Sequence, residues 1–453
     1  MKRVLLIALF SSVVFALALT GCGGGSSTPP FQATGTSAII QGGDATDPNI
    51  LKFELNITAI TLTGVSPTAT TGNLLAKPAE FEFVHTAGTL EPLSLANIPA
   101  GTYSGATLTI GGAEVVVVNG TTPTKVPATV SSSTVTVAIS PNLVVTSAPL
   151  FLNFDLDLAK SVTLTGTAPI TGATVTPTFT VTSTTTPPAG NEGNEDHNDG
   201  ELEDVHGKVT TIAAPSFTID TGKTTITFAT DANTKFKDGI TQLSDLKVGD
   251  IVEVDGMTKA DGSHLATKVE REGGSSGEEV EGIASAVTGS PATLVTVAHQ
   301  VDSNNSTSTT APVTVDVTVN ASTVFSVRGD KLNVTGTFDA THIAKGQRIE
   351  ADANTTATPV VATKIKLREQ ALVGTVAASP APTTSGFTLT IDPTSAFGKL
   401  TGATSVAVTF ASGSSVTVTP TAGATVRVRG LVFASANTAA TYTMTAVRGD
   451  DNK

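Results

Sequence analysis

The chain has 453 residues, enough for two to four domains, and 39% of them are hydrophobic, which is sufficient to bury real cores. It holds 18 Phe, 2 Tyr and no Trp, while Thr, Val, Ala and Gly dominate, a composition that favours β-sheet and excludes a mostly helical protein. The net charge of -13 repels phosphate backbones, so we expect no nucleic-acid partner. With one cysteine and no Cys/His spacing for zinc, we expect no disulfide, no metal centre and no cofactor.

The first segment has the order of features found in an export signal. Lys2 and Arg3 precede an apolar run over 4–19 that is too short for a confident membrane span. The run ends in Leu19-Thr20-Gly21-Cys22, which resembles the lipobox of bacterial lipoproteins; the alternative is a coincidental cysteine in an ordinary signal peptide. The resemblance implies that residues 1–21 are removed and that Cys22 is lipidated, so that the membrane is a partner through the N-terminal lipid.

Two further features follow from this resemblance. Gly23 is not the Asp that retains such proteins at the inner membrane, which favours the outer membrane of a bacterial cell envelope. Residues 22–35, which include the letters GGGSSTPP, have the composition of a flexible tether.

Two changes in composition divide the remaining chain. Residues 183–204 are nearly free of aliphatic side chains and rich in acids, which predicts a linker. Residues 273–278 contain the letters GGSSG between glutamates and predict a second, solvated linker. We therefore expect a β-sandwich over 36–182 and three repeats over 205–272, 279–369 and 370–453.

The part before the first linker has the pattern of a sandwich. About seven short segments alternate apolar and polar residues, with Gly, Pro, Asn and Ser between them. In the stretch Ile98-Pro99-Ala100-Gly101-Thr102-Tyr103, Pro and Gly predict a tight turn that leads into a strand whose Tyr covers the sandwich edge. This stretch resembles an uncharacterised family of prokaryotic envelope domains, a resemblance that implies no catalytic residues.

After the linker the chain repeats itself. Each unit begins with an apolar-x-Gly pattern at Gly207, Gly282 or Gly374, and later strands also recur. In the first unit Gly249 predicts a turn, and the next strand places Val252 and Val254 on one face and Glu253 on the other. Five strands in this order are typical of the small barrels that bind oligonucleotides or oligosaccharides, and a small open sandwich is the alternative. The pattern also resembles an uncharacterised repeat domain of bacterial lipoproteins. The expected fold class is all-β: an N-terminal β-sandwich followed by three small OB-like β-barrel repeats.

Short motifs point weakly to chemistry. The letters G-x-S-x-G at 273–277 lie in acidic linker rather than at a strand-to-helix turn, so we expect no catalytic residue there. Gly222-Lys223-Thr224 favours a hairpin turn over a phosphate loop, and the Arg-Gly-Asp letters at 328–330 and 448–450 favour turns over an adhesion motif. The six histidines show no local metal-binding pair.

The acidic linker is the one candidate cation contact. Glu195, Asp196 and Asp199 offer oxygen ligands, but the segment lacks the glycine of a calcium loop, and a solvated, self-repelling spacer is the preferred interpretation.

We therefore expect a lipid-anchored, non-enzymatic cell-envelope protein with a structural, adhesive or binding role, whose partners include envelope polysaccharide or protein. The alternative is an array of carbohydrate- or calcium-binding modules that captures envelope polysaccharide, and an exported hydrolase is the third hypothesis.

Overall fold

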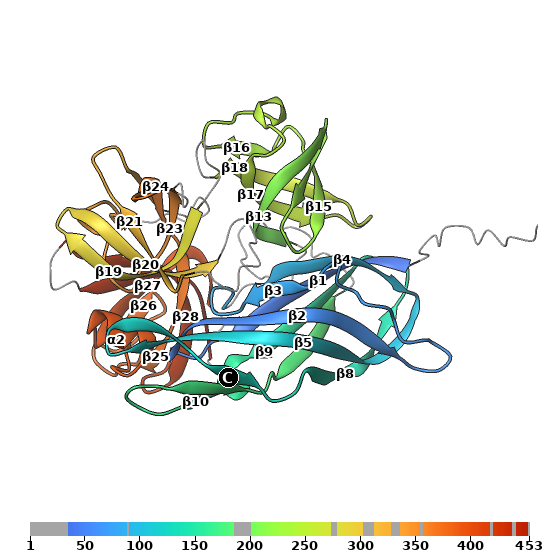
Figure 1. Ribbon diagram of the computed structural model, residues 1–453, viewed down its shortest axis with the longest axis horizontal. Coiled ribbons are helices and arrows are strands. Elements are labelled where there is room, and N and C mark those ends of the chain that lie inside the picture. Colours follow the sequence, from blue (N-terminus) through green and yellow to red (C-terminus); the bar gives the residue numbers. More distant parts are fainter. Residues whose placement is uncertain are drawn as a thin grey trace, which may run out of the picture. The chain divides into compact units, whose positions relative to one another are not determined.

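The computed structural model describes residues 35–87, 90–184, 201–272, 279–301, 312–327, 336–353, 357–416, 420–436 and 441–451 (Figure 1). Contacts divide the chain into Met1–Thr34 and a second compact unit, Gly35–Lys453. The second unit is all-β and contains a sandwich followed by three small barrels, which confirms the expected fold class. Within these ranges, no helix has both the length and the apolar character needed to cross a bilayer.

The sandwich is built from strands β1 to β12. One sheet has the order β12-β9-β1-β4, the other has the order β3-β2-β5-β6 with β8 also paired to β5, and a small third sheet has the order β10-β11-β7. The elements are β1 Gly35–Ala45, β2 Ile50–Gly64, β3 Ala79–Glu82, β4 Glu91–Pro99, β5 Gly101–Asn119, β6 Thr122–Val126, β7 Ala128–Val130, β8 Thr134–Val145, β9 Leu150–Asp157, α1 Leu158–Ser161, β10 Val162–Thr165, β11 Gly172–Val175 and β12 Phe179–Thr184.

Two strands are much longer than the short segments that we expected. β2 has 15 residues and β5 has 19, and they pair with each other along most of their length. The ladder has register shifts at Asn56/Ile57, Ile57/Ala59 and Thr63/Gly64. Because such bulges bend and twist a strand pair, the two long strands can follow the core instead of ending at its edge.

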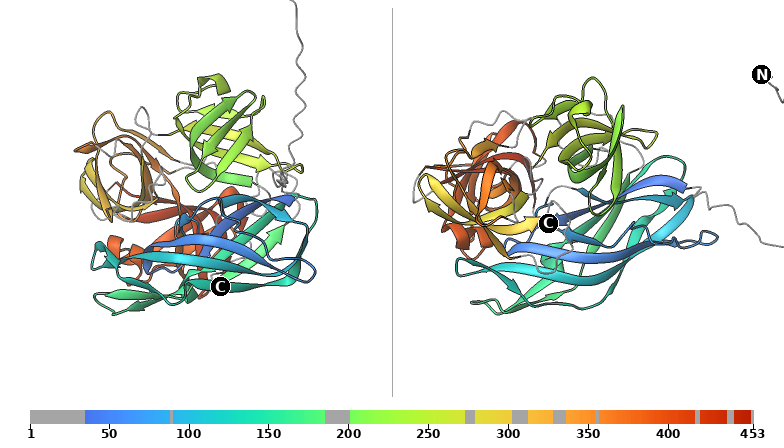
Figure 2. Two further views of the ribbon diagram at one scale, coloured as in Figure 1. Left: turned by 45° about the vertical axis from the view of Figure 1, so that its right-hand side comes forward. Right: turned by 45° about the horizontal axis from the view of Figure 1, so that its top comes forward.

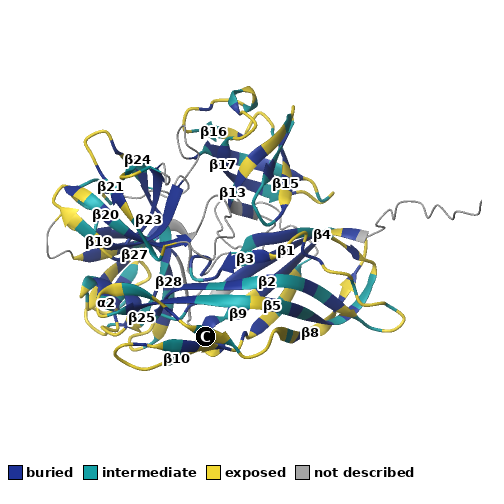
Figure 3. Ribbon diagram, viewed as in Figure 1, coloured by how far each residue is buried: buried dark blue, intermediate teal, exposed yellow. Residues whose placement is uncertain are grey.

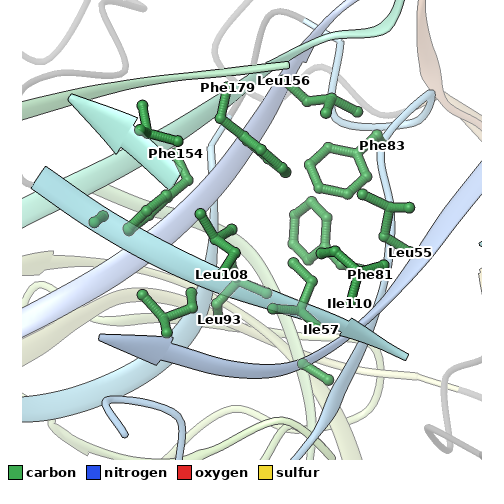
Figure 4. Close-up of a cluster of buried hydrophobic side chains, with 14 of the residues drawn as sticks. Leu55, Ile57, Phe81, Phe83, Leu93, Leu108, Ile110, Phe154, Leu156 and Phe179 are labelled. Atoms are coloured by element: carbon green, nitrogen blue, oxygen red, sulfur yellow. The ribbon is translucent and has the colours of Figure 1, made fainter. Parts of the chain in front are cut away.

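The core of the sandwich lies between the two main sheets and is rich in phenylalanine (Figure 4). Phe81 and Phe83 have ring centroids 4.7 Å apart in an edge-on arrangement, and Phe179 lies 6.0 Å from Phe83. Leu55 and Ile57 of β2 are both fully buried, as the period-two pattern requires. Burial of a large apolar side chain contributes about 1.5–3 kcal/mol, so this cluster is a principal source of the stability of the sandwich.

The Pro-Gly turn before β5 forms as predicted, with one correction. β4 ends at Pro99 and β5 begins at Gly101, so a single residue joins the two strands. Tyr103, however, is buried in the core instead of covering an edge, and its hydroxyl donates to the carbonyl of Pro99 at 2.8 Å. Since a buried hydroxyl needs a partner, this bond allows the ring to enter the core.

The three barrels share one topology. The five main strands of each barrel are counted here as one to five. Their order is one-two-three-five-four and back to one, with strands three and five parallel. Figure 2 gives two further views of these barrels. This closed Greek-key order is that of the OB type, and it excludes the alternative of an open sandwich.

The barrel elements follow one another along the chain. They are β13 Glu201–Ala213, β14 Ser216–Asp220, β15 Thr225–Ala229, β16 Lys235–Lys237, η1 Leu243–Asp245, β17 Ile251–Thr258 and β18 His264–Arg271 in the first barrel; β19 Glu279–Gly289, β20 Ala292–Val301, β21 Thr314–Thr318, β22 Val324–Val327, β23 Arg348–Ala353 and β24 Val360–Leu367 in the second; and β25 Glu369–Val376, β26 Gly386–Thr390, α2 Ala396–Thr401, β27 Ser405–Val416, β28 Thr425–Ala434 and β29 Tyr442–Asp451 in the third. β13 begins inside the segment that we expected to be linker.

The repeated apolar-x-Gly pattern has a steric cause. A Cβ atom at Gly207, Gly282 or Gly374 would lie 3.0, 1.9 or 2.4 Å from a backbone oxygen of the second strand of its own barrel. The first strand of each barrel therefore passes too close to its neighbour for any side chain at this position, which explains why glycine recurs there.

Candidate functional site

The fourth strand of the first barrel shows where polar groups gather. Val252 and Val254 of β17 belong to the barrel core, as predicted, and Glu253 points the other way. Glu253 is nevertheless 0% exposed, and Figure 3 colours much of β17 as buried. Arg368 of the second repeat donates to Glu253 at 2.7 Å and Lys366 lies 3.9 Å from it, so residues of the second repeat cover this outer face. The outer faces of β17 and β18 therefore form part of a buried joint with β19, β23 and β24, which we call the inter-barrel joint.

The joint is crowded with charge. Its buried carboxyl groups come from both barrels and outnumber its buried cations. Among the residues that the structure describes, the carboxyl groups are those of Glu253, Asp255, Glu270, Glu272, Glu279, Glu281, Glu350 and Asp352, and the cations are Lys268, Arg348, Lys366 and Arg368. His206 and Lys364 lie at its half-buried edge.

Lys366 of β24 and Arg368, which directly follows this strand, hold the two barrels together. The Nζ atom of Lys366 lies 2.8 Å from Glu270, 3.1 Å from Glu272 and 3.1 Å from Glu350. The guanidinium of Arg368 donates to Glu253 at 2.7 Å and lies 3.0 Å from Glu350. Each cation thus bridges a carboxylate of the first barrel to one of the second.

The carboxyl groups of the joint fall into two classes, those whose pKa the cations lower and those whose pKa stays raised. Burial opposes ionisation of Glu350, but Lys366 and Arg368 outweigh it and hold the pKa of this carboxyl well below its usual range. Burial likewise opposes ionisation of Glu270, yet Lys366 lowers its pKa to about 2. Both side chains are therefore ionised at neutral pH.

Glu272 and Glu279 belong to the other class. Burial raises the pKa of Glu279 well above its usual range, and the neighbouring carboxylates of Glu350, Glu281 and Asp352 raise it further. Burial and Glu350 do the same to Glu272. In the described residues the joint thus contains carboxyl groups whose charge its cations do not balance.

Four of these carboxyl groups converge. Glu272, Glu279, Glu350 and Asp352 each offer one carboxylate oxygen, and the four atoms all lie within 4.8 Å of one another. His206, Glu279 and Glu281 form a second, overlapping group of the same kind. Carboxylate oxygens at such spacing suit a hard divalent cation.

This joint was not predicted from the sequence. We expected Glu272, Glu279 and Glu281 only to bracket the linker at 273–278 and gave them no role, whereas their exposed fractions are 1%, 4% and 2%. A signal was present in the repeat, because Glu350 occupies in the second unit the place that Glu253 occupies in the first. Charges that recur on the outer face of successive barrels are consistent with a shared interface.

The site residues predicted from the sequence lie elsewhere. Cys22, Glu195, Asp196 and Asp199 fall outside the described residues, and so do the letters G-x-S-x-G at 273–277 and the first Arg-Gly-Asp. The second Arg-Gly-Asp lies within β29 and not in a turn, so that expectation is wrong, whereas Gly222-Lys223-Thr224 lies in the hairpin turn between β14 and β15, as predicted.

A second buried polar group lies in the sandwich. The ring of His85 is placed between Glu82, 2.8 Å from Nδ1, and Glu91, 2.5 Å from Nε2. The backbone carbonyl of His85 accepts from Arg348 and Arg429. A cavity of about 80 Å³ adjoins this group; it is far smaller than the roughly 300–1,000 Å³ of a ligand pocket.

The comparisons with known proteins identify one domain. The family model described as Domain of unknown function (DUF5666) matches residues 206–270, so the first barrel contains a domain of that family and the two later barrels repeat its architecture. No curated protein matches the chain.

Two solved structures show a weak likeness. A Drosophila Unr fragment, CSD456, has 14% identity and a TM-score of 0.14, with 55% of this chain and 96% of that chain covered. A multidomain protein with nucleic acid binding domains from Streptococcus pneumoniae has 12% identity and a TM-score of 0.12, with 53% and 72% covered.

These neighbours require a correction. We excluded nucleic acid as a partner from net charge, and we withdraw that exclusion: it conflicts with a structural neighbour described as having nucleic acid binding domains, and the net charge of a whole chain does not describe the surface of one barrel. At TM-scores of 0.14 and 0.12 the likeness carries no argument about what this chain binds.

Proposed function

We propose that this chain is a lipid-anchored protein of the bacterial cell envelope, held at the outer membrane, with a non-enzymatic structural or adhesive role. The observation that carries the proposal is the order of features in the sequence: a basic start, an apolar run, Leu19-Thr20-Gly21-Cys22 and a Gly- and Ser-rich tether. A tether ahead of a folded unit keeps that unit clear of the bilayer surface.

The inter-barrel joint supports a structural role. Lys366 and Arg368 each bridge carboxylates of two successive barrels, and buried ion pairs of this kind fix one arrangement of two surfaces. Three barrels joined in series can present their loops as one scaffold to envelope polysaccharide or protein.

The hypothesis of an exported hydrolase has less support. Glu272 and Glu350 are paired carboxyl groups of the kind that acid-base catalysis uses, but each is only 1% exposed. A substrate cannot reach this pair without separating the two barrels.

Lipidation is tested at one residue. Because only a thiolate is alkylated at this position, Cys22→Ser is expected to abolish incorporation of radiolabelled palmitate and to release the protein from the membrane fraction. Ser27→Ala in the tether is the matched control and retains both properties. Equal labelling of the Cys22→Ser variant would contradict the lipid anchor. A binding screen of the full chain against envelope glycans and proteins then tests the adhesive role.

A further inference from the structure

The convergent carboxyl groups of the inter-barrel joint point to a bound cation. We propose that Glu272, Glu279, Glu350 and Asp352 form a calcium site that joins the first and second barrels. Glu272 follows β18 of the first barrel, Glu279 opens β19 of the second, and Glu350 and Asp352 lie on β23. The proposal is independent of lipidation and does not involve Glu195, Asp196 or Asp199, the cation contacts considered from the sequence.

Proximity of acids alone does not make a site, and the decisive residue is Glu279. Its side chain is 1% exposed, and neither of its carboxylate oxygens has a hydrogen-bond partner in the described structure. Nδ1 of His206 lies 3.5 Å from its Oε1 atom, beyond a normal hydrogen bond. A buried carboxyl group without a hydrogen bond loses several kcal/mol of solvation, so a ligand at this position would compensate it.

Glu272 adds a second oxygen of the same kind. Its Oε1 atom accepts from Lys366 at 3.1 Å, whereas its buried Oε2 atom has no hydrogen-bond partner among the described residues. Lys366 also lies near Glu253, Glu270 and Glu350. Arg368 also contacts Glu253 and Glu350, whereas the ammonium that pairs with Glu272 is one that Glu272 shares with three other carboxylates.

The ligand type and spacing favour calcium. All donors are carboxylate oxygens, which hard cations prefer over nitrogen or sulfur. Calcium binds oxygen at about 2.3–2.6 Å, so oxygens on opposite sides of the ion are up to about 5 Å apart. The 4.8 Å that bounds the four atoms fits inside this shell, whereas magnesium at about 2.0–2.1 Å requires contraction to about 4.2 Å.

The test is calorimetry of the full chain, stripped with EDTA and titrated with calcium chloride at pH 7.5 in about 0.15 M salt. We expect one site per chain with a dissociation constant of about a millimolar or tighter, and weaker binding of magnesium. Glu279→Gln is expected to weaken calcium binding at least about tenfold. The matched control is the linker triple variant Glu195→Gln, Asp196→Asn, Asp199→Asn, which retains the site.

Thermal unfolding separates loss of the site from loss of the fold. Calcium is expected to raise the melting temperature of the wild type but not that of Glu279→Gln. The metal-free variant should melt at or above the wild type, because a neutral amide replaces an uncompensated carboxyl group. Should Glu279→Gln fail to fold, Glu272→Gln provides the same comparison.

Three results would overturn the proposal: no stoichiometric binding by the wild type, unchanged affinity in Glu279→Gln, or loss of the site in the linker triple variant. Manganese soaked into crystals gives the position directly, since its anomalous signal should lie among the four carboxyl groups. Signal elsewhere in the chain would equally contradict the assignment.

Discussion

His85 shows how a single buried residue sets a dependence on pH. Burial opposes the charged imidazolium, but the carboxylates of Glu91 and Glu82 outweigh it and raise the pKa of His85 above its usual 6.5. Further charges face the group from other elements: Lys223 lies 3.5 Å from Glu91, and Arg348 and Arg429 donate to the backbone carbonyl of His85. The side chain is therefore a charged partner of two acids.

The sign of the effect follows from the raised pKa. A group whose pKa is higher in the folded state contributes stability that is fully present below its unfolded value of about 6.5 and is lost as the pH rises through the folded value. His85→Gln is thus expected to lower the free energy of unfolding by about 3–5 kcal/mol at pH 6 and by clearly less at pH 9.5.

Urea denaturation followed by circular dichroism at both pH values measures this difference. His342→Gln is the control, because His342 pairs with Asp339 at a partly exposed position and should cost no more than about 1 kcal/mol. An equal loss at pH 6 and pH 9.5 for His85→Gln would contradict the charged state of His85.

At the scale of single turns and strands, the structure could be predicted from the sequence. The turn glycines Gly249, Gly346 and Gly423 all have positive φ values, of 101°, 83° and 83°, and the following strands alternate inward and outward as their letters indicate. Turn chemistry and period two are local properties, so they can be read without knowing which surfaces meet. The barrels were predictable for this reason.

The glycines in the first strands of the barrels should differ in how strongly they resist substitution by alanine. A Cβ atom at Gly282 would lie 1.9 Å from the carbonyl oxygen of Ala298, whereas at Gly207 the nearest oxygen is 3.0 Å away. Gly282→Ala is expected to lower the free energy of unfolding by about 1–3 kcal/mol or more, because the backbone must move to admit the methyl group. Gly207→Ala should lower the free energy of unfolding by less.

Gly112→Ala in β5 is the matched control, since nothing lies within 4 Å of the added methyl group. In this variant the free energy of unfolding should stay unchanged or rise by about 0.5–1 kcal/mol, because alanine is less flexible than glycine in the unfolded chain. Thermal melts of the three variants test the order, and equal losses at Gly207 and Gly282 would contradict the steric account.

At the scale of the whole molecule, the contacts between the first and second barrels could not be predicted from the sequence. Composition predicted a linker at 273–278, which lies outside the described residues, but it gave no sign that Glu272 and Glu279 on either side are buried. No local pattern in the sequence indicates whether the polar outer face of a strand will be covered by another barrel. The charges at equivalent places in β17 and β23, such as Glu253 and Glu350, were the available signal, and their meaning depends on contacts between strands far apart in the chain.

The last prediction measures the coupling between barrels. Arg368 of the second barrel donates to Glu253 of the first at 2.7 Å, and the side chains are 3% and 0% exposed. Removing either partner leaves a buried charge uncompensated, so Arg368→Gln and Glu253→Gln should each cost about 3–5 kcal/mol. The double variant should cost less than the sum of the two by about 1–3 kcal/mol, since it removes both charges together.

A double-mutant cycle by urea denaturation, followed by circular dichroism because the chain has no Trp, gives this coupling energy. The control cycle uses Lys77→Gln and Asp220→Asn, a 3.3 Å pair whose side chains are 44% and 40% exposed and whose coupling should stay below about 1 kcal/mol. Raising the salt to about 0.5 M should weaken the control pair and leave the buried pair nearly unchanged, because solvent ions do not reach it. Additive losses for Glu253 and Arg368 would mean that the two barrels are independent modules and that the charges at their joint do not hold them together.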